Sequence, residues 1–262
     1  MNIGGAVGPF IALAVRQSIG ISYVLVVSSA TSFLLFAATL LFYREPPRPA
    51  DAPSATSMAK VLRDMMTVFG NVRFIAFLVI FSGFWAMFWH VFYALPFYVK
   101  DYLRFERFEI IETVDAWTII LVTVPVTAVA KRLEPLTAMA VGFTIATASW
   151  FVMASMPGIP FTVLAMSLFA IGEGLQSPRY YEYVAALAPK QQVGTYMGFA
   201  FLPIAIGTFI AGASSGYLVK HYVEGGNPNA PHMWFVVGSY GVVCTILMIV
   251  YDQLVAPTRA AA

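Results

Sequence analysis

An acidic residue beside an apolar stretch is the position in this sequence best suited to chemistry. Glu173 is the second residue of the stretch 172–178 (GEGLQSP), which follows the apolar run 159–171. If this region crosses a membrane, a bare carboxylate costs at least about 2.5 kcal/mol at a helix centre, so we expect it to face a cavity, a partner or a proton. A carboxyl group kept from water could exchange a proton. The alternative role is a structural hydrogen bond to a neighbouring helix.

Other polar and aromatic residues could line the same cavity. Gln176 follows Glu173 at i+3, so the two share a helix face. His90 and Tyr93 form a second i, i+3 pair, and Trp89 could stack on a ligand. Because an imidazole titrates near neutral pH, His90 could also relay protons. The alternatives are a neutral histidine bonded to a backbone carbonyl and ordinary aromatic packing for Trp89.

Four further polar residues have other expected roles. Asp115 comes at the start of the apolar segment 114–130, where a negative charge suits the positive end of the helix dipole, and proton or substrate binding is equally open. Tyr180 is best interpreted as an interfacial polar residue. His221 and His232 lack compact ligand spacing, so we expect no metal site.

Composition places the chain among membrane proteins. Of its 262 residues, 60% are hydrophobic and only 11% are charged, and its mean hydropathy is +0.78. A net charge of +2 is too small to indicate nucleic-acid binding. Signatures of phosphate-binding loops, serine nucleophiles and zinc hydrolases are absent from the sequence, so we expect neither an enzyme nor a cofactor.

Apolar segments long enough for membrane helices predict an all-α, polytopic bundle. Pro96, Pro125 and Pro203 are expected to kink their helices, and glycines four residues apart, such as Gly194 and Gly198, to permit close helix packing. The first segment is too short to span a bilayer. The eight segments are 2–14, 21–43, 74–99, 114–130, 136–156, 159–176, 193–219 and 233–251.

Loop charges predict the orientation. If the linker 44–72 is cytoplasmic, ten of the 15 Lys and Arg residues lie inside, as the positive-inside rule expects. The C-terminus is then cytoplasmic, and the cell membrane, such as a bacterial inner membrane, is the expected location. The charged stretch 100–112 becomes a solvated outer loop. Residues 58–69 form an amphipathic helix, with Ser57 as a possible cap, that lies on the inner membrane surface or packs on helix ends.

Three stretches carry a resemblance to a known family. Residues 2–6 (NIGGA), 170–189 and 197–202 (MGFAFL) resemble parts of the fifth, tenth and eleventh helices of proton-coupled oligopeptide transporters, a family within the major facilitator superfamily. The resemblance implies a major-facilitator-like fold, present here as helices five to twelve only. Residues 1–43 would be the last two helices of the first half, 44–72 the linker and 73–262 the six-helix second half.

The resemblance implies secondary active transport of a small, peptide-like solute by alternating access, with a proton gradient as driving force. It adds Asn2 to the substrate-binding candidates Glu173, His90, Trp89, Tyr93 and Gln176, and makes Glu173, His90 and Asp115 the proton-coupling candidates. Because Asn2 matches a position inside a helix, Met1 is expected to lie within a truncated span. The expected partners are the lipid bilayer, the solute, and either the missing first half or a second copy.

The chain departs from this family at three candidate positions. Ala200 stands where the family usually has Trp, His90 where it has Gln, and Asp115 where it tends to have Asn-Pro. These changes alter the side chains that would meet a peptide. The alternative to transport is a non-transporting membrane fragment or a helical interaction module.

Overall fold

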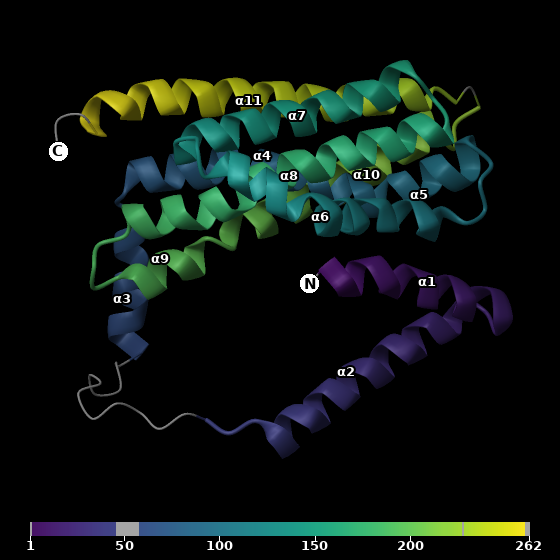
Figure 1. Ribbon diagram of the computed structural model, residues 1–262, viewed down its shortest axis with the longest axis horizontal. Helices are drawn as coiled ribbons and strands as arrows, with labels where there is room; N and C mark the ends of the chain where they lie inside the picture. The colour runs from purple at the N-terminus through teal and green to yellow at the C-terminus, as the bar shows by residue number, and fades with distance from the viewer. Residues whose placement is uncertain (1, 46–57, 227, 260–262) are drawn as a thin grey trace.

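All regular secondary structure in the described part of the chain is helical (Figure 1). The computed structural model describes residues 2–45, 58–226 and 228–259. Within these residues lie α1 (Asn2–Ser18), α2 (Ser22–Phe42), α3 (Met58–Val68), α4 (Val72–Tyr93), α5 (Leu95–Phe97), the π-helix η1 (Tyr98–Tyr102), α6 (Phe108–Ala130), α7 (Pro135–Ser155), α8 (Ile159–Leu187), α9 (Val193–Phe199), α10 (Leu202–Tyr222) and α11 (Ala230–Arg259).

Seven helical stretches in the described residues are long and apolar enough to cross a membrane. The prediction of an all-α polytopic bundle is therefore confirmed. The 17-residue α1 is not among them, as its length predicted. The seven are Ser22–Phe42, Val72–Tyr102, Phe108–Ala130, Pro135–Ser155, Ile159–Leu187, Val193–Tyr222 and Ala230–Leu254.

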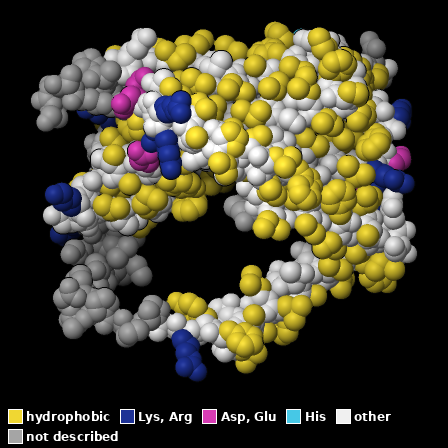
Figure 2. Space-filling view, in the orientation of Figure 1, with side chains coloured by type: hydrophobic (Ala, Val, Ile, Leu, Met, Phe, Trp, Pro, Cys, Tyr) yellow, Lys and Arg dark blue, Asp and Glu magenta, His cyan; other side chains and the backbone are white. Residues whose placement is uncertain are grey.

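The helices from α4 to α11 form one bundle, and the first two helices lie at its side (Figure 1). Within the bundle, α7 packs along α8 and α11, α4 packs on α10 and α11, and α6 packs on α8. The helix α1 lies against α6, whereas α2 has no buried residue and contacts α1. Figure 2 shows the molecule hollowed between α2 and the bundle, with hydrophobic side chains along the exposed helix.

Two of the membrane-length stretches are interrupted, each close to a proline. In the stretch Val72–Tyr102 the helix α4 ends before Ala94, two residues before Pro96, and the stretch continues through α5 and η1. The stretch Val193–Tyr222 is interrupted between Phe199 and Leu202. Backbone groups released at such breaks need partners inside a membrane. Here the Tyr180 hydroxyl on α8 donates a 2.7 Å hydrogen bond to the carbonyl oxygen of Ala200.

The amphipathic helix of the linker is confirmed as α3. Directly after it, Phe69 packs edge-to-face on Phe199 of α9. Asn71 then accepts a hydrogen bond from the amide of Phe74 and donates one to the Tyr196 hydroxyl, so this end of the linker is attached to the bundle. The predicted cap Ser57 lies outside the described residues.

The close helix packing predicted at Gly194 and Gly198 is wrong. A Cβ atom added to Gly194 or Gly198 would meet nothing within 4 Å. The close helix approach is instead between α7 and α8, where a Cβ on Gly172 would lie 2.6 Å from the carbonyl oxygen of Gly142. Spacing within one helix cannot identify such a contact, because it depends on which face the helix turns toward its neighbour.

Candidate functional site

Glu173 faces the interior of the bundle. Phe169, one turn before it on α8, stacks on Phe84 of α4 with ring centroids 5.3 Å apart. Tyr180, two turns after it, stacks on Phe81 of α4 at 4.0 Å. Positions i−4, i and i+7 share one helix face, so Glu173 lies between these two aromatic contacts. Its Oε2 atom is buried and has no hydrogen-bond partner. This oxygen atom of the carboxyl group is thus shielded inside the bundle.

Asp115 lies on α6 near Glu173. The helix begins at Phe108, so Asp115 is two turns inside it, and the prediction that it stabilises a helix start is wrong. Its Oδ1 atom is buried without a hydrogen-bond partner. The two carboxyl groups are near enough for their charges to interact. One turn further along α6, the Thr118 hydroxyl lies 3.3 Å from the Ser167 hydroxyl and joins the same two helices.

Gln176 is a second polar residue buried on α8. Its side chain has 0% exposure, and neither its amide nitrogen nor its amide oxygen has a hydrogen-bond partner. It packs beside Gly142 of α7. The structure therefore places Gln176 within one turn of Glu173, as the i+3 spacing predicted.

His90 has the contacts expected of a structural histidine. It is fully buried, its Nδ1 lies 2.6 Å from the carbonyl oxygen of Ala86, and its Nε2 lies 3.2 Å from the Ser214 hydroxyl of α10. Since a carbonyl only accepts hydrogen bonds, Nδ1 carries a proton. A role of His90 in substrate binding or proton relay stays a prediction.

Trp89 and Tyr93 pack on each other rather than on Glu173. Their rings stack with centroids 5.6 Å apart. The Tyr93 ring approaches Gly212 of α10, so this part of α4 faces a different neighbour from the part that meets α8. Asn2 is exposed at the start of α1. The structure thus places Asp115 within electrostatic reach of Glu173 and places Gln176 beside α7. The contacts described for His90, Trp89 and Tyr93 are within α4 and with α10.

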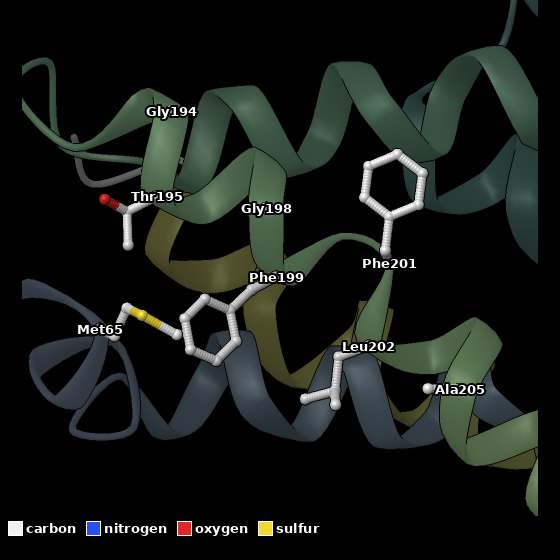
Figure 3. Close-up of a pocket in the computed structure, with 8 residues that line it drawn as sticks. All are labelled: Met65, Gly194, Thr195, Gly198, Phe199, Phe201, Leu202 and Ala205. Atoms are coloured by element: carbon white, nitrogen blue, oxygen red, sulfur yellow. The ribbon is translucent and has the colours of Figure 1, made fainter. Parts of the chain in front are cut away.

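Two cavities lie elsewhere in the molecule. One of about 640 Å³ separates α3 from α9 and α10, and Figure 3 shows Met65, Phe199 and Leu202 among its mostly apolar lining. The other, of about 690 Å³, lies between α1 and α2. Glu173 lines neither, so the cavity expected around it stays a prediction. The described residues contain no group of three or more His, Cys, Asp and Glu side chains that could hold a metal ion.

An ion pair that the sequence analysis missed lies at the start of α6. Arg16 at the end of α1 donates from Nε to Glu109 at 2.5 Å and from Nη2 to the same carboxylate at 3.1 Å. Its Nη2 also donates to the carbonyl oxygen of Glu106 at 2.9 Å. The Glu109 side chain is only 6% exposed, so the prediction of a solvated loop over 100–112 is wrong at this position. The three-residue spacing of Glu109, Glu112 and Asp115 is the signal that could have predicted a helix here.

Together, the seven membrane-length helices of the described residues define a polytopic membrane protein. The family model of the Major Facilitator Superfamily matches residues 1–212, and the chain belongs to this superfamily. A curated relative, the multidrug resistance protein MdtH of Sodalis glossinidius (strain morsitans), is 25% identical over 195 residues. That match covers 73% of this chain and 46% of the relative, so the chain spans about half the relative's length.

Solved transporter structures show the same fold. The nucleoside transporter NupG superposes with a TM-score of 0.74 at 16% identity, covering 95% of this chain and 65% of that one. A POT family transporter in complex with a thioalcohol-conjugated peptide gives 0.59 at 15% identity, covering 94% and 51%. A peptide transporter POT gives 0.55 at 19% identity, covering 97% and 51%. The resemblance to a superfamily transporter of the oligopeptide type is confirmed at the level of fold.

Proposed function

We propose that this protein acts in secondary active transport, coupling the movement of a small solute across the cell membrane to a proton gradient by alternating access. One observation carries the proposal: Glu173 and Asp115 lie on adjacent membrane helices with buried oxygen atoms that have no hydrogen-bond partner. Isolated carboxylates inside a membrane are costly, and those that persist commonly bind protons, ions or substrates. Glu173 exchanges the coupled proton.

The substrate proposal rests on resemblance and on the printed names of similar proteins. A peptide-like solute follows from the sequence resemblance and from the POT family structures. The departures from the family at Ala200, His90 and Asp115 broaden the choice of candidate substrates. The similar structure of the nucleoside transporter NupG adds nucleosides as a second class of test substrate. A proton gradient supplies the energy, so the proposal includes neither a cofactor nor enzymatic chemistry. The distribution of Lys and Arg supports a cytoplasmic C-terminus.

The proposal includes a partner for α2, which is either the rest of a longer chain or a second copy of this one. The apolar α2 has no buried residue, which supports packing against the rest of a longer chain or against a second copy. The alternative function is that of a non-transporting membrane module.

Transport is tested in liposomes containing the purified chain. We expect labelled L-alanyl-L-alanine or uridine to accumulate under an inward pH gradient and not after a protonophore. Glu173→Gln should abolish accumulation and spare exchange of labelled for unlabelled solute, because the amide cannot release a proton. The matched control is Glu182→Gln on the same helix, whose side chain is 54% exposed. Accumulation by Glu173→Gln at the wild-type rate would refute the coupling role, and no accumulation by the wild type would favour the non-transporting alternative.

A further inference from the structure

A line of polar side chains runs along α6 from one end of the bundle toward its interior. Glu109, Glu112, Asp115 and Thr118 follow one another at three-residue intervals. Each interval turns the line by about 60° around the helix axis, since an α-helix has about 3.6 residues per turn. The line therefore winds from one neighbouring helix to another. It begins at Glu109, which binds Arg16 of α1, and reaches Ser167 of α8 at Thr118.

Neighbouring acidic groups along this line interact through their charges. The charge of Glu109 acts on Glu112, and the charge of Asp115 acts on Glu173. Side chains three residues apart on a helix have Cβ atoms about 5–6 Å apart, so Glu112 and Asp115 are also neighbours. The acidic groups thus form a continuous series from the start of α6 to the middle of α8.

The inner end of the series contains buried polar atoms without protein partners. These are Oδ1 of Asp115, Oε2 of Glu173 and both amide atoms of Gln176, whose side chain is fully buried. In proteins, ordered water commonly bonds to such groups and can link them to one another. Gln176 is independent of the carboxyl groups, and its burial on the same face as Glu173 points to water as the bound species.

A purely structural role explains Glu109 but not Glu112. Arg16 directs two nitrogen atoms to Glu109 and one to the carbonyl oxygen of Glu106. Glu109 is therefore held as the charged member of an ion pair that fastens α1 to α6. Glu112, one turn further in and half-buried, is the outermost carboxyl group of the line that this ion pair does not use.

We propose that Glu112 is the outermost residue of a proton path along α6 that ends at Glu173. This proposal rests on the proposed proton-coupled function and specifies the route by which the proton arrives. Glu112 takes a proton from water at the end where α6 begins and passes it to Asp115. The hydroxyl groups of Thr118 and Ser167, with bridging water, each accept one proton and release their own, and Glu173 receives the last. Every intermediate group then returns to its starting protonation state.

Hydrogen–deuterium exchange of the Glu173 carboxyl group tests this route without any transported solute. The purified chain is placed in lipid nanodiscs at acidic pH, and its protonated carboxyl C=O bands are recorded by infrared spectroscopy after a change to deuterated buffer. The band that Glu173→Gln removes is assigned to Glu173. We expect Glu112→Gln to slow its deuteration at least about tenfold, because an acid that relays protons is lost. Glu112→Asp, which keeps a carboxyl group, should recover most of the rate.

Two further variants make the result decisive. Glu106→Gln, which removes an exposed carboxylate at the same end of the bundle, should leave the deuteration rate unchanged. Thr118→Val keeps the side-chain shape and removes the hydroxyl group, so it should slow deuteration even if Glu112→Gln fails to fold. Wild-type deuteration in Thr118→Val, or in a folded Glu112→Gln variant, would overturn the route. Because no gradient or solute is used, a failure of the transport assay does not decide this outcome.

Discussion

The ion pair between Arg16 and Glu109 should control how firmly α1 is held to α6. The perturbation is Glu109→Gln, which keeps the size of the side chain and removes its charge. The two residues are 93 positions apart in sequence. Arg16 Nε lies 2.5 Å from Glu109 Oε1, and Arg16 Nη2 lies 3.1 Å from Glu109 Oε2. Glu109 is 6% exposed, whereas Arg16 is 23% exposed.

The expected loss follows from this unequal burial. A hydrogen bond to a charged group contributes about 1.5–3 kcal/mol, and removing one partner of a fully buried pair costs about 3–5 kcal/mol. Arg16 reaches water and keeps its bond to the Glu106 carbonyl oxygen, so the loss should lie near the lower range, at about 2 kcal/mol. Every 1.4 kcal/mol is a factor of ten in an equilibrium constant, so opening of this contact should increase about 30-fold.

Amide hydrogen exchange measured by mass spectrometry reports this opening. In nanodiscs, peptides covering residues 10–20 and 105–113 should lose up to about 30-fold protection in Glu109→Gln, because exchange there follows local opening. Peptides from α7 and α11 should be unchanged, and Glu106→Gln should behave like the wild type. Equal protection in Glu109→Gln and Glu106→Gln would refute the reasoning that the ion pair fastens α1.

Two other expectations follow from close helix contacts. A Cβ added to Gly5 would lie 3.3 Å from the Cβ of Ala116. Gly5→Cys combined with Ala116→Cys, in a Cys244→Ala background, should therefore form a disulfide under mild oxidation, seen as a shift in electrophoretic mobility. Absence of the shift would contradict the docking of α1 on α6. A Cβ on Gly172 would meet backbone atoms of α7 at 2.6 and 2.9 Å, so Gly172→Ala should destabilise the bundle by about 1–3 kcal/mol and lower the Tm in detergent. Gly194→Ala, at a position with open space, is the matched control and should not lower it.

The sequence predicted the membrane helices well because length and apolar content are local properties. It placed the start of α6 at residue 114, six residues late, because Glu109 and Glu112 were interpreted as loop charges. Their helix is compatible with these charges because Arg16, far away in sequence, neutralises one of them. Local pattern cannot identify a partner that only the tertiary fold supplies.

In the candidate site, too, local features could be predicted from the sequence, whereas contacts between helices could not. That Glu173 would avoid lipid could be predicted from the cost of its charge, and the burial of its Oε2 atom agrees. Its association with Asp115 could not be predicted, because the relative rotation and depth of α6 and α8 depend on packing. His90 shows the converse, since its type and depth suggested chemistry while its two ring nitrogens contact a backbone carbonyl and Ser214.

The hydrogen bond from Tyr180 to the Ala200 carbonyl oxygen connects the interrupted stretch of α9 and α10 to α8, the helix that carries Glu173. A tilt of α9 relative to α10 must either break this bond or carry α8 with it. Breaking it would leave a carbonyl oxygen without a partner among stacked rings, at a cost of about 1–3 kcal/mol. The interruption between α9 and α10 and the segment of α8 that carries Glu173 are therefore expected to move together, because the Tyr180 hydroxyl connects them.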